Sequence, residues 1–355
     1  MRRIALLGAT GSIGRQALEI VADHPELELV AAASGSQEID GLAPLTQVGG
    51  DLTELLERAE PDVVLNAVVG FAGLPATLWA LERGVDLALA NKESLVAGGG
   101  LALEAWKRGR GRLLPVDSEH SAAFQLVDGR EPETVRSLVL TASGGPFRGR
   151  SRADLEQVTP ADALAHPTWS MGPKITVDSA TLMNKGLELI EAHFLFALPY
   201  ERIEVVVHPS SIVHALVNLR DGAALAHLGY PDMRVPISYA LTYPERAATA
   251  IEPLDLASGL ILEFQAPDEE AFPCLSLARA AGEAGGTAPC VLNAANEVAV
   301  AAFLDGELPF PGIADVVERT LAQVGHAPAA DLDELTARDS EARHAASVLL
   351  RQLVH

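Results

Sequence analysis

Hydrophobic and polar positions follow a regular order over the first 117 residues, with short β-rich runs alternating with amphipathic helical stretches. This alternation predicts βαβ units and a parallel sheet. The expected strands are Arg3–Leu7, Leu27–Ala32, Asp62–Val68, Asp86–Leu89 and Arg112–Val116. The expected helices lie near Ser12–Ala22, Asp51–Ala59, Leu74–Glu82 and Glu93–Arg108. The connection from Gly35 to Gly50 is too brief for a further strand with its helix, so this half of the sheet is expected to be trimmed.

The pattern changes between residues 118 and 242. Helices are expected near Ser118–Val127 and Asp178–Phe196, among strands near Val135–Thr141, Ile203–His208, Val213–Leu219 and Ala223–His227. The last two strands meet at Asp221-Gly222, a strong hairpin signal, so an α+β domain with antiparallel pairing is predicted. A loop-rich linker over residues 243–268 follows. Helical patterns dominate residues 269–355, for example Val291–Leu304 and Asp331–Leu353.

Composition narrows the classes of partner. The chain has 355 residues, 48% of them hydrophobic, and a formal net charge of −22. That charge argues against nucleic acid and anionic membranes as partners, because both are bound mainly through Lys and Arg. The longest uncharged run, Val63 to Leu81, contains Asn, Gly and Pro and is not expected to span a membrane. No signal peptide is expected at the N-terminus. Two cysteines without metal-ligand spacing favour a reducing cytoplasm.

A glycine-rich run, Gly8-Ala9-Thr10-Gly11-Ser12-Ile13-Gly14, follows the first strand and opens a helix. Glycines there let the backbone approach a pyrophosphate beside the free N–H groups of a helix N-terminus, so nucleotide binding is predicted. The alternative is a plain strand–helix turn. The second strand ends in Gly35-Ser36-Gln37, where an NAD-type site would have a carboxylate, and this difference favours NADP.

Two further runs carry acidic residues. Asp117 and Glu119 end a predicted sheet strand and point to one side, which suits half of a divalent-cation site; the alternative is a helix N-cap. Asn184, Lys185 and Glu188 fall within little more than one helical turn, where Lys185 and Glu188 form either a functional group or a helix-surface pair. The chain has only four lysines against twenty-two arginines, which favours a functional choice.

Three loops complete the candidates. The run from His166 to Lys174, with Trp169 and Met171, suggests a lid that excludes water, the alternative being a loop that packs its Trp in the core. The run around Ser143 is a glycine-rich nest suited to a phosphate. His214 follows a short Pro-Ser-Ser loop on a strand, and a histidine there is more often structural than catalytic. Oxygen ligands without a Cys or His cluster favour Mg²⁺ or Mn²⁺ over zinc.

Together these motifs resemble the 1-deoxy-D-xylulose 5-phosphate reductoisomerase family. The matching segments run in order from residue 4 to about 304: GATGSIG, LANKESLVAGG, LPVDSEHSA, TASGGPF, HPTWSMGPKITVDSATLMNKGLELIEA, HPSSIVH, LGYPDMRVPI and LNAANEVAVAAFL. The resemblance implies an α/β protein with a Rossmann-like NADPH domain (residues 1–117), an α+β catalytic and dimerisation domain (118–242) and a C-terminal helical domain (269–355). It also implies a soluble, cytoplasmic homodimer in isoprenoid precursor synthesis that binds neither nucleic acid nor membrane.

The resemblance also implies a role for each matched residue. The expected metal ligands are Asp117, Glu119 and Glu188. The expected substrate and catalytic residues are Lys92, Ser118, Ser143, His166, Trp169, Met171, Ser179, Asn184, Lys185 and His214. The expected NADPH residues are Thr10, Gly11, Ser12, Ile13, Asn91, Glu93 and Gly172. Gly35, Ser36 and Gln37 are added to the expected cofactor site because they end the second strand, not because they match the family. The implied reaction rearranges a phosphorylated ketose, 1-deoxy-D-xylulose 5-phosphate, and reduces the resulting aldehyde to 2-C-methyl-D-erythritol 4-phosphate.

The sequence departs from the family pattern at the adenosine end of the cofactor site. The family often has a Lys after the glycine that ends the second strand, whereas this chain has Ser36 and Gln37. Two other functions remain open from the residues alone. A metal-free NADP-dependent dehydrogenase of the semialdehyde or homoserine type would share the glycine run but give the carboxylates no role. A non-catalytic NADP sensor would bind cofactor without turnover.

Overall fold

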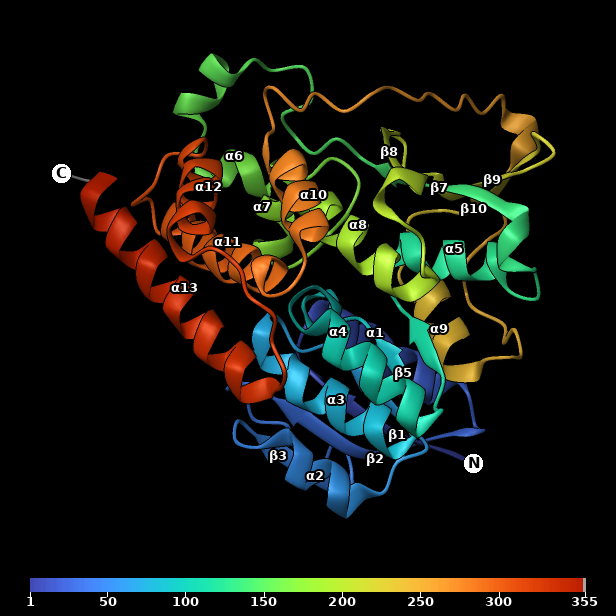
Figure 1. Ribbon diagram of the computed structural model, residues 1–355. Coiled ribbons are helices and arrows are strands. Elements are labelled where there is room, and N and C mark those ends of the chain that lie inside the picture. The colour runs from blue at the N-terminus through green and yellow to red at the C-terminus, as the bar shows by residue number, and fades with distance from the viewer. Residues whose placement is uncertain (354–355) are drawn as a thin grey trace. The chain divides into compact units, whose positions relative to one another are not determined.

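A computed structural model describes residues 1–353, which divide into two compact units (Figure 1). The first unit comprises residues 1–95, 99–125 and 232–254. The second comprises residues 96–98 and 126–231, and the chain from residue 255 onward. No helix among residues 1–353 combines the length and apolar character needed to cross a bilayer.

The first unit is built on a parallel six-stranded sheet in the order β3-β2-β1-β4-β5-β6. Its strands are β1 (Arg2–Leu7), β2 (Leu27–Ser34), β3 (Leu45–Val48), β4 (Val63–Asn66), β5 (Asp86–Leu89) and β6 (Leu113–Pro115). The connecting helices are α1 (Ser12–Asp23), α2 (Leu52–Ala59), α3 (Leu74–Arg83), α4 (Lys92–Gly109) and α5 (Ser118–Val127). The strand order reverses beside β1, and ligands of such sheets bind at the carboxyl ends of the strands at this point.

The connection between Gly35 and Gly50 differs in part from the prediction. It contains the short strand β3, which pairs in parallel with β2 through residues Ala31 to Ser34. A β2–β3 crossover helix is absent from it. A strand of four residues, all of them at least partly exposed, carries too little hydrophobic pattern to be recognised in the sequence.

The second unit contains a four-stranded sheet in the order β10-β9-β7-β8. Its strands are β7 (Val135–Ala142), β8 (Ile203–Val207), β9 (Val213–Leu219) and β10 (Ala224–Leu228). The β7–β8 pair is parallel, and β9 pairs antiparallel with both β7 and β10. The predicted hairpin is confirmed, since Gly222 has a φ of +91° and Asp221 accepts a hydrogen bond from the Ala223 N–H at 2.9 Å.

Helices make up the rest of the second unit. Between β7 and β8 lie α6 (Pro160–Leu164), α7 (Pro173–Ala180) and α8 (Met183–Phe196). After a long loop come α10 (Cys274–Ala284), α11 (Ala288–Leu304), α12 (Gly312–Val324) and α13 (Leu332–Leu353), drawn in orange and red in Figure 1. α11 packs against both α12 and α13, so it is the central helix of this group. The predicted C-terminal helical part is confirmed.

The single helix predicted over Asp178–Phe196 is wrong, because the chain forms two helices there. Pro173 starts α7 five residues before Asp178, and α7 ends at Ala180. Leu182 has a φ of +61° and separates α7 from α8. Asp178 and Ser179 therefore lie inside a helix and are not N-caps. No glycine or proline marks this break, so the helical pattern appears continuous in the sequence.

A helix that the sequence analysis missed, α9 (Arg234–Thr242), belongs to the first unit. Its Ile237 and Leu241 are fully buried in the core that contains Ile4 and Leu6 of β1. After the four-stranded sheet of the second unit, the chain therefore returns to the first unit and its six-stranded sheet. The three-part division at residues 117, 242 and 268 stays a prediction.

Candidate functional site

The turn between β1 and α1 has the geometry of a phosphate-binding loop. Gly8 has a φ of +87°, and a Cβ there would lie 2.4 Å from the Ala67 carbonyl oxygen. A Cβ at Gly14 would lie 2.2 Å from the Gly8 carbonyl oxygen, so only glycine permits this tight turn. No side chain caps α1, which leaves the N–H groups of its first turn directed at an incoming anion. The loop fits a pyrophosphate.

The end of β2 offers only neutral groups close to this loop. The N–H groups of Gly8 and Ala9 both donate to the Ala33 carbonyl, which joins the loop to β2. Gly35, Ser36 and Gln37 follow β2 and are exposed. The nearest arginine in sequence to the loop is Arg15, whose Nη1 donates to the Thr10 carbonyl.

Asn91 is a buried residue that shapes the loop after β4. Its Oδ1 accepts from the Ser94 N–H at 3.1 Å and caps α4. Its Nδ2 donates to the carbonyls of Val68 (2.6 Å) and Gly70 (2.9 Å), and lies 3.2 Å from a Glu93 carboxylate oxygen. Asn91 and Glu93, both predicted at the cofactor site, therefore meet at the carboxyl end of the sheet.

The carboxylates of Asp117 and Glu119 meet where β6 passes into α5. Their oxygens lie within 4.8 Å of each other. Lys92 forms an ion pair with Asp117, and the Ser118 hydroxyl donates to Glu119. The backbone carbonyl of Asp117 accepts from the Ser121 N–H, so Asp117 also takes the cap position. The predicted helix cap and the predicted cation half-site are therefore compatible. The Asp117 backbone starts the helix, while the side chains of Asp117 and Glu119 form an oxygen-rich cluster.

Glu188 on α8 is the third predicted metal ligand and belongs to the second unit. It is 1% exposed and accepts from Asn184 Nδ2 at 2.5 Å, and it forms an ion pair with Lys185, which is 3% exposed. This burial rules out a helix-surface pair. Charges are retained at buried positions only when they are paired, as Glu188 and Lys185 are here.

A close approach fixes the helix that carries this cluster. A Cβ at Gly186 would lie 2.4 Å from the Cβ of Ala278 on α10. α8 and α10 therefore touch directly at the position between Lys185 and Glu188.

Ser143 and His166 form the next pair, in the loops after β7 and α6. Ser143 Oγ lies 2.9 Å from His166 Nε2. His166 Nδ1 accepts from the N–H groups of Thr168 (3.1 Å) and Trp169 (2.9 Å), so the ring carries its proton on Nε2 and donates to Ser143. Burial lowers the pKa of His166, which favours this neutral form. The His166 imidazole thus joins the segment predicted to be a lid, at Thr168 and Trp169, to the glycine-rich loop of Ser143.

Trp169 and His214 form a neighbouring aromatic contact. Trp169 is only half-buried, and its ring centroid lies 6.3 Å from that of His214. Trp169 is therefore not a core residue. Burial, together with the neighbouring His227, lowers the pKa of His214 to about 4, so this imidazole is neutral at pH 7. The sequence analysis missed His227, although the Asp221-Gly222 turn fixes a hairpin register that brings it close to His214.

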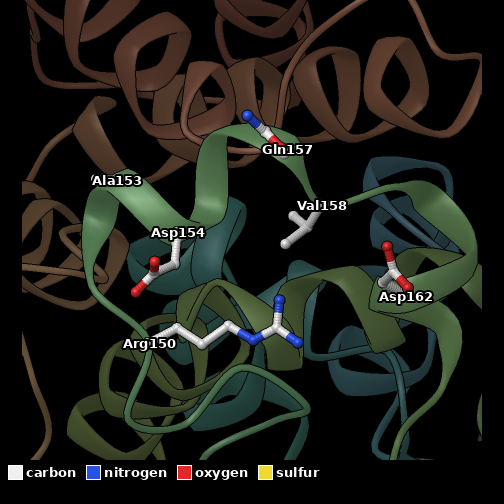
Figure 2. Close-up of a pocket in the computed structure, with 6 residues that line it drawn as sticks. All are labelled: Arg150, Ala153, Asp154, Gln157, Val158 and Asp162. Carbon is white, nitrogen blue, oxygen red and sulfur yellow. The ribbon is translucent and has the colours of Figure 1, made fainter.

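A separate hollow of about 520 Å³ lies beside α6 and contains none of the predicted site residues (Figure 2). Figure 2 shows the Arg150 side chain extending across it, with Asp154 and Asp162 on its two sides. Each carboxylate completes a capping box, Asp154 with Ser151 and Asp162 with Thr159. These acids are structural, and they stiffen the segment that leads into the lid.

Models of one protein family match the chain over most of its length. The model described as 1-deoxy-D-xylulose 5-phosphate reductoisomerase matches residues 4–49 and 47–99, and its C-terminal domain model matches residues 113–196. A model of the DXP reductoisomerase C-terminal domain matches residues 228–345.

Relatives and solved structures carry the same name. A 1-deoxy-D-xylulose 5-phosphate reductoisomerase of Pseudomonas putida is 48% identical over 99% of this chain and 98% of its own length. The enzyme of Xanthomonas axonopodis pv. citri is 47% identical over 100% and 97%. The Zymomonas mobilis enzyme in complex with NADPH superposes with a TM-score of 0.89 at 40% identity, covering 98% and 99% of the two chains. A DOX-P reductoisomerase in complex with NADPH, fosmidomycin and magnesium gives 0.93 at 38% identity and covers 99% of both. The chain therefore belongs to the 1-deoxy-D-xylulose 5-phosphate reductoisomerase family.

Proposed function

We propose that this protein converts 1-deoxy-D-xylulose 5-phosphate to 2-C-methyl-D-erythritol 4-phosphate with NADPH and a divalent metal ion, as a step of non-mevalonate isoprenoid precursor synthesis. The observation that carries this function is the 48% identity to a named reductoisomerase over 99% of the chain. The family's polar residues are also present in structured clusters in each unit. The metal-free dehydrogenase and the cofactor sensor are not favoured, because neither gives the buried Glu188 cluster a task.

Asp117, Glu119 and Glu188 are proposed as the ligands of Mg²⁺ or Mn²⁺. Three carboxylates make a hard, anionic donor set that suits these ions. When bound, the ion supplies Lewis acidity toward the ketone and adjacent hydroxyl oxygens of the substrate. Lys92 and Ser118 hold the first two carboxylates in place, as Asn184 and Lys185 hold the third.

The substrate phosphate is assigned to neutral donors and one lysine. These are Ser143, Ser179, Asn184 and Lys185, with His166 donating to Ser143 and keeping its hydroxyl oriented. Such a site suits a chain of net charge −22, since a phosphate must be bound locally against the overall field. Trp169 and Met171 close over the substrate and exclude water from the aldehyde before its reduction. His214 stands behind Trp169 as a neutral imidazole.

NADPH is assigned to the loop at Thr10–Ile13 and to Asn91, Glu93 and Gly172. The Gly8 and Gly14 geometry supports this assignment, because the loop leaves no room for larger residues beside a pyrophosphate. The adenosine end rests on Gly35, Ser36 and Gln37. These residues accept a 2′-phosphate without a carboxylate opposing it, and they provide no lysine.

A homodimer in the cytoplasm, with the three-part domain division given above, is also proposed. The segment after residue 255 in the second unit leaves large apolar side chains exposed, namely Leu256, Ile261, Leu262 and Phe264. Exposed apolar groups of this size commonly mark an interface, which supports self-association. The two cysteines, Cys274 and Cys290, are buried free thiols and suit a reducing compartment.

The direct test is NADPH consumption with 1-deoxy-D-xylulose 5-phosphate, with and without EDTA. Turnover that EDTA abolishes and added Mg²⁺ or Mn²⁺ restores is expected. Turnover that continues in EDTA would instead favour a metal-free dehydrogenase. Cofactor binding without turnover would favour the sensor.

A further inference from the structure

Two asparagines of α11 occupy positions where polar groups are costly. Asn293 and Asn296 are both fully buried, among Ala294, Ala295 and Ala299 of the same helix. Each leaves its side-chain carbonyl oxygen without a hydrogen-bond partner among residues 1–353. A buried, unpaired amide oxygen lowers stability relative to an alanine, so a function is needed to account for the side chain.

The two amides differ in what their nitrogens bind. Asn293 Nδ2 donates to Glu297 of its own helix at 2.8 Å. Asn296 Nδ2 instead donates to Asp178 Oδ1 on α7 at 2.8 Å, across 118 residues of sequence. Asp178 is 1% exposed, and its second oxygen lies 2.9 Å from Lys174 Nζ. A buried carboxylate on α7 is thus held from α11 on one side and from its own first turn on the other.

α7 carries two elements of the proposed site. Lys174 lies in its first turn and is the last residue of the segment predicted to be a lid. Ser179, a proposed phosphate ligand, follows Asp178. The end of α7 also packs against the loop of Ser143, since a Cβ at Gly145 would lie 3.0 Å from the Ser179 carbonyl oxygen. The position of α7 therefore sets both the lid's anchor and the distance between two proposed phosphate ligands.

We propose that Asn296 is a positioning residue for substrate binding, which it controls by holding Asp178 and with it α7. This inference rests on the proposed function, in which Ser179 binds the substrate phosphate. It gives the C-terminal helical part of the chain a role in substrate affinity without a contact to the substrate. Asn296 orients one carboxylate, and that carboxylate fixes the helix that presents Ser179.

Loss of the Asn296 side chain should weaken substrate binding more than it slows the reaction of bound substrate. Removing the Asn296 amide leaves the Asp178–Lys174 ion pair in place, but α7 loses the side-chain hydrogen bond that joins Asp178 to α11. A hydrogen bond to a charged group corresponds to roughly tenfold or more in an equilibrium constant. We expect Asn296→Ala to raise the KM for the ketose phosphate about tenfold while kcat changes less than about threefold.

Asn293→Ala is the matched control, because it removes the same side chain with the same burial from the same helix. Affinity for inorganic phosphate, measured by calorimetry without cofactor or metal, gives a second readout independent of turnover. Asn296→Ala should weaken phosphate binding about tenfold, and Asn293→Ala should leave it unchanged. Equal weakening in both variants, or unchanged phosphate binding in Asn296→Ala, would overturn the proposal.

Exchanging the Asn and Asp side chains between positions 296 and 178 tests the same hydrogen bond if Asn296→Ala does not fold. Asn296→Asp places two carboxylates against each other and should weaken phosphate binding. Adding Asp178→Asn restores one donor and one acceptor in this contact, and should recover most of the lost affinity. If the double variant binds phosphate no better than Asn296→Asp, the hydrogen bond is not what positions α7. Failure of the wild-type protein to turn over the ketose phosphate would instead count against the proposed function, whatever the phosphate affinities.

Discussion

Replacing His214 with glutamine should make the protein less sensitive to acid. His214 lies on β9 with 7% of its surface exposed, and burial together with His227 and Lys185 lowers its pKa from 6.5 to about 4. The folded protein therefore binds a proton at this ring more weakly than the unfolded chain does. Glutamine keeps a polar side chain of similar length and does not titrate.

The difference in pKa between the folded and the unfolded protein determines how His214 changes stability with pH. Since the folded pKa is depressed, the contribution of His214 to stability is complete above pH 6.5 and is lost as pH falls toward 4. The difference between a pKa of 6.5 and one of about 4 corresponds to about 3.4 kcal/mol of stability in total. About 2.5 kcal/mol of this stability is lost by about pH 4.5, because the His214 ring is then almost fully protonated in the unfolded chain and only partly protonated in the folded protein.

Urea unfolding of both proteins at pH 7 and at pH 4.5 provides the measurement. His214→Gln should lose about 2.5 kcal/mol less free energy of unfolding on acidification than the wild type. Any packing defect caused by glutamine is present at both pH values and cancels in this comparison. An acid-induced loss equal in the two proteins within about 0.5 kcal/mol would refute the reasoning.

Three other predictions concern the proposed site. Removing one carboxylate charge should lower kcat/KM by roughly 100-fold or more at limiting Mg²⁺, while the circular dichroism spectrum stays native, in each of three variants: Asp117→Asn, Glu119→Gln and Glu188→Gln. Wild-type turnover in all three variants would contradict the proposed metal site. Proteolysis near Trp169 should slow when NADPH and a phosphonate analogue of the substrate are both present, whereas equal cleavage with and without them would argue against a lid. Ser36→Lys should lower the KM for NADPH about tenfold and hardly change that for NADH, because it adds a charge-assisted contact to the 2′-phosphate. Arg15→Ala should raise the KM for NADPH, and insensitivity to both cofactor variants would contradict this view of the adenosine end.

The sequence predicts features that depend on local signals. The glycine run after β1 needs a turn that only glycine allows, and Asp221-Gly222 closes a hairpin through its own backbone and side chain. The acidic pair at Asp117 and Glu119 is readable because it directly follows a strand. In each case the residues that determine the structure are neighbours in the chain.

The remaining features depend on contacts between distant residues. The break at Leu182 has no glycine or proline, and a buried leucine adopts the left-handed conformation there. The burial of Lys185 and Glu188 depends on the residues that surround α8. Their spacing in the sequence therefore could not exclude an ion pair on the helix surface. Asn296 pairs with Asp178 across 118 residues, and no local pattern distinguishes it from Asn293.

The contact between Gly186 and Ala278 limits how the buried charges on α8 can change in evolution. Here any side chain at Gly186 would collide with α10, since a Cβ already comes within 2.4 Å of Ala278, and close-packed interiors accommodate such additions poorly. Lys185 and Glu188 therefore cannot be shifted together by a single change at this position.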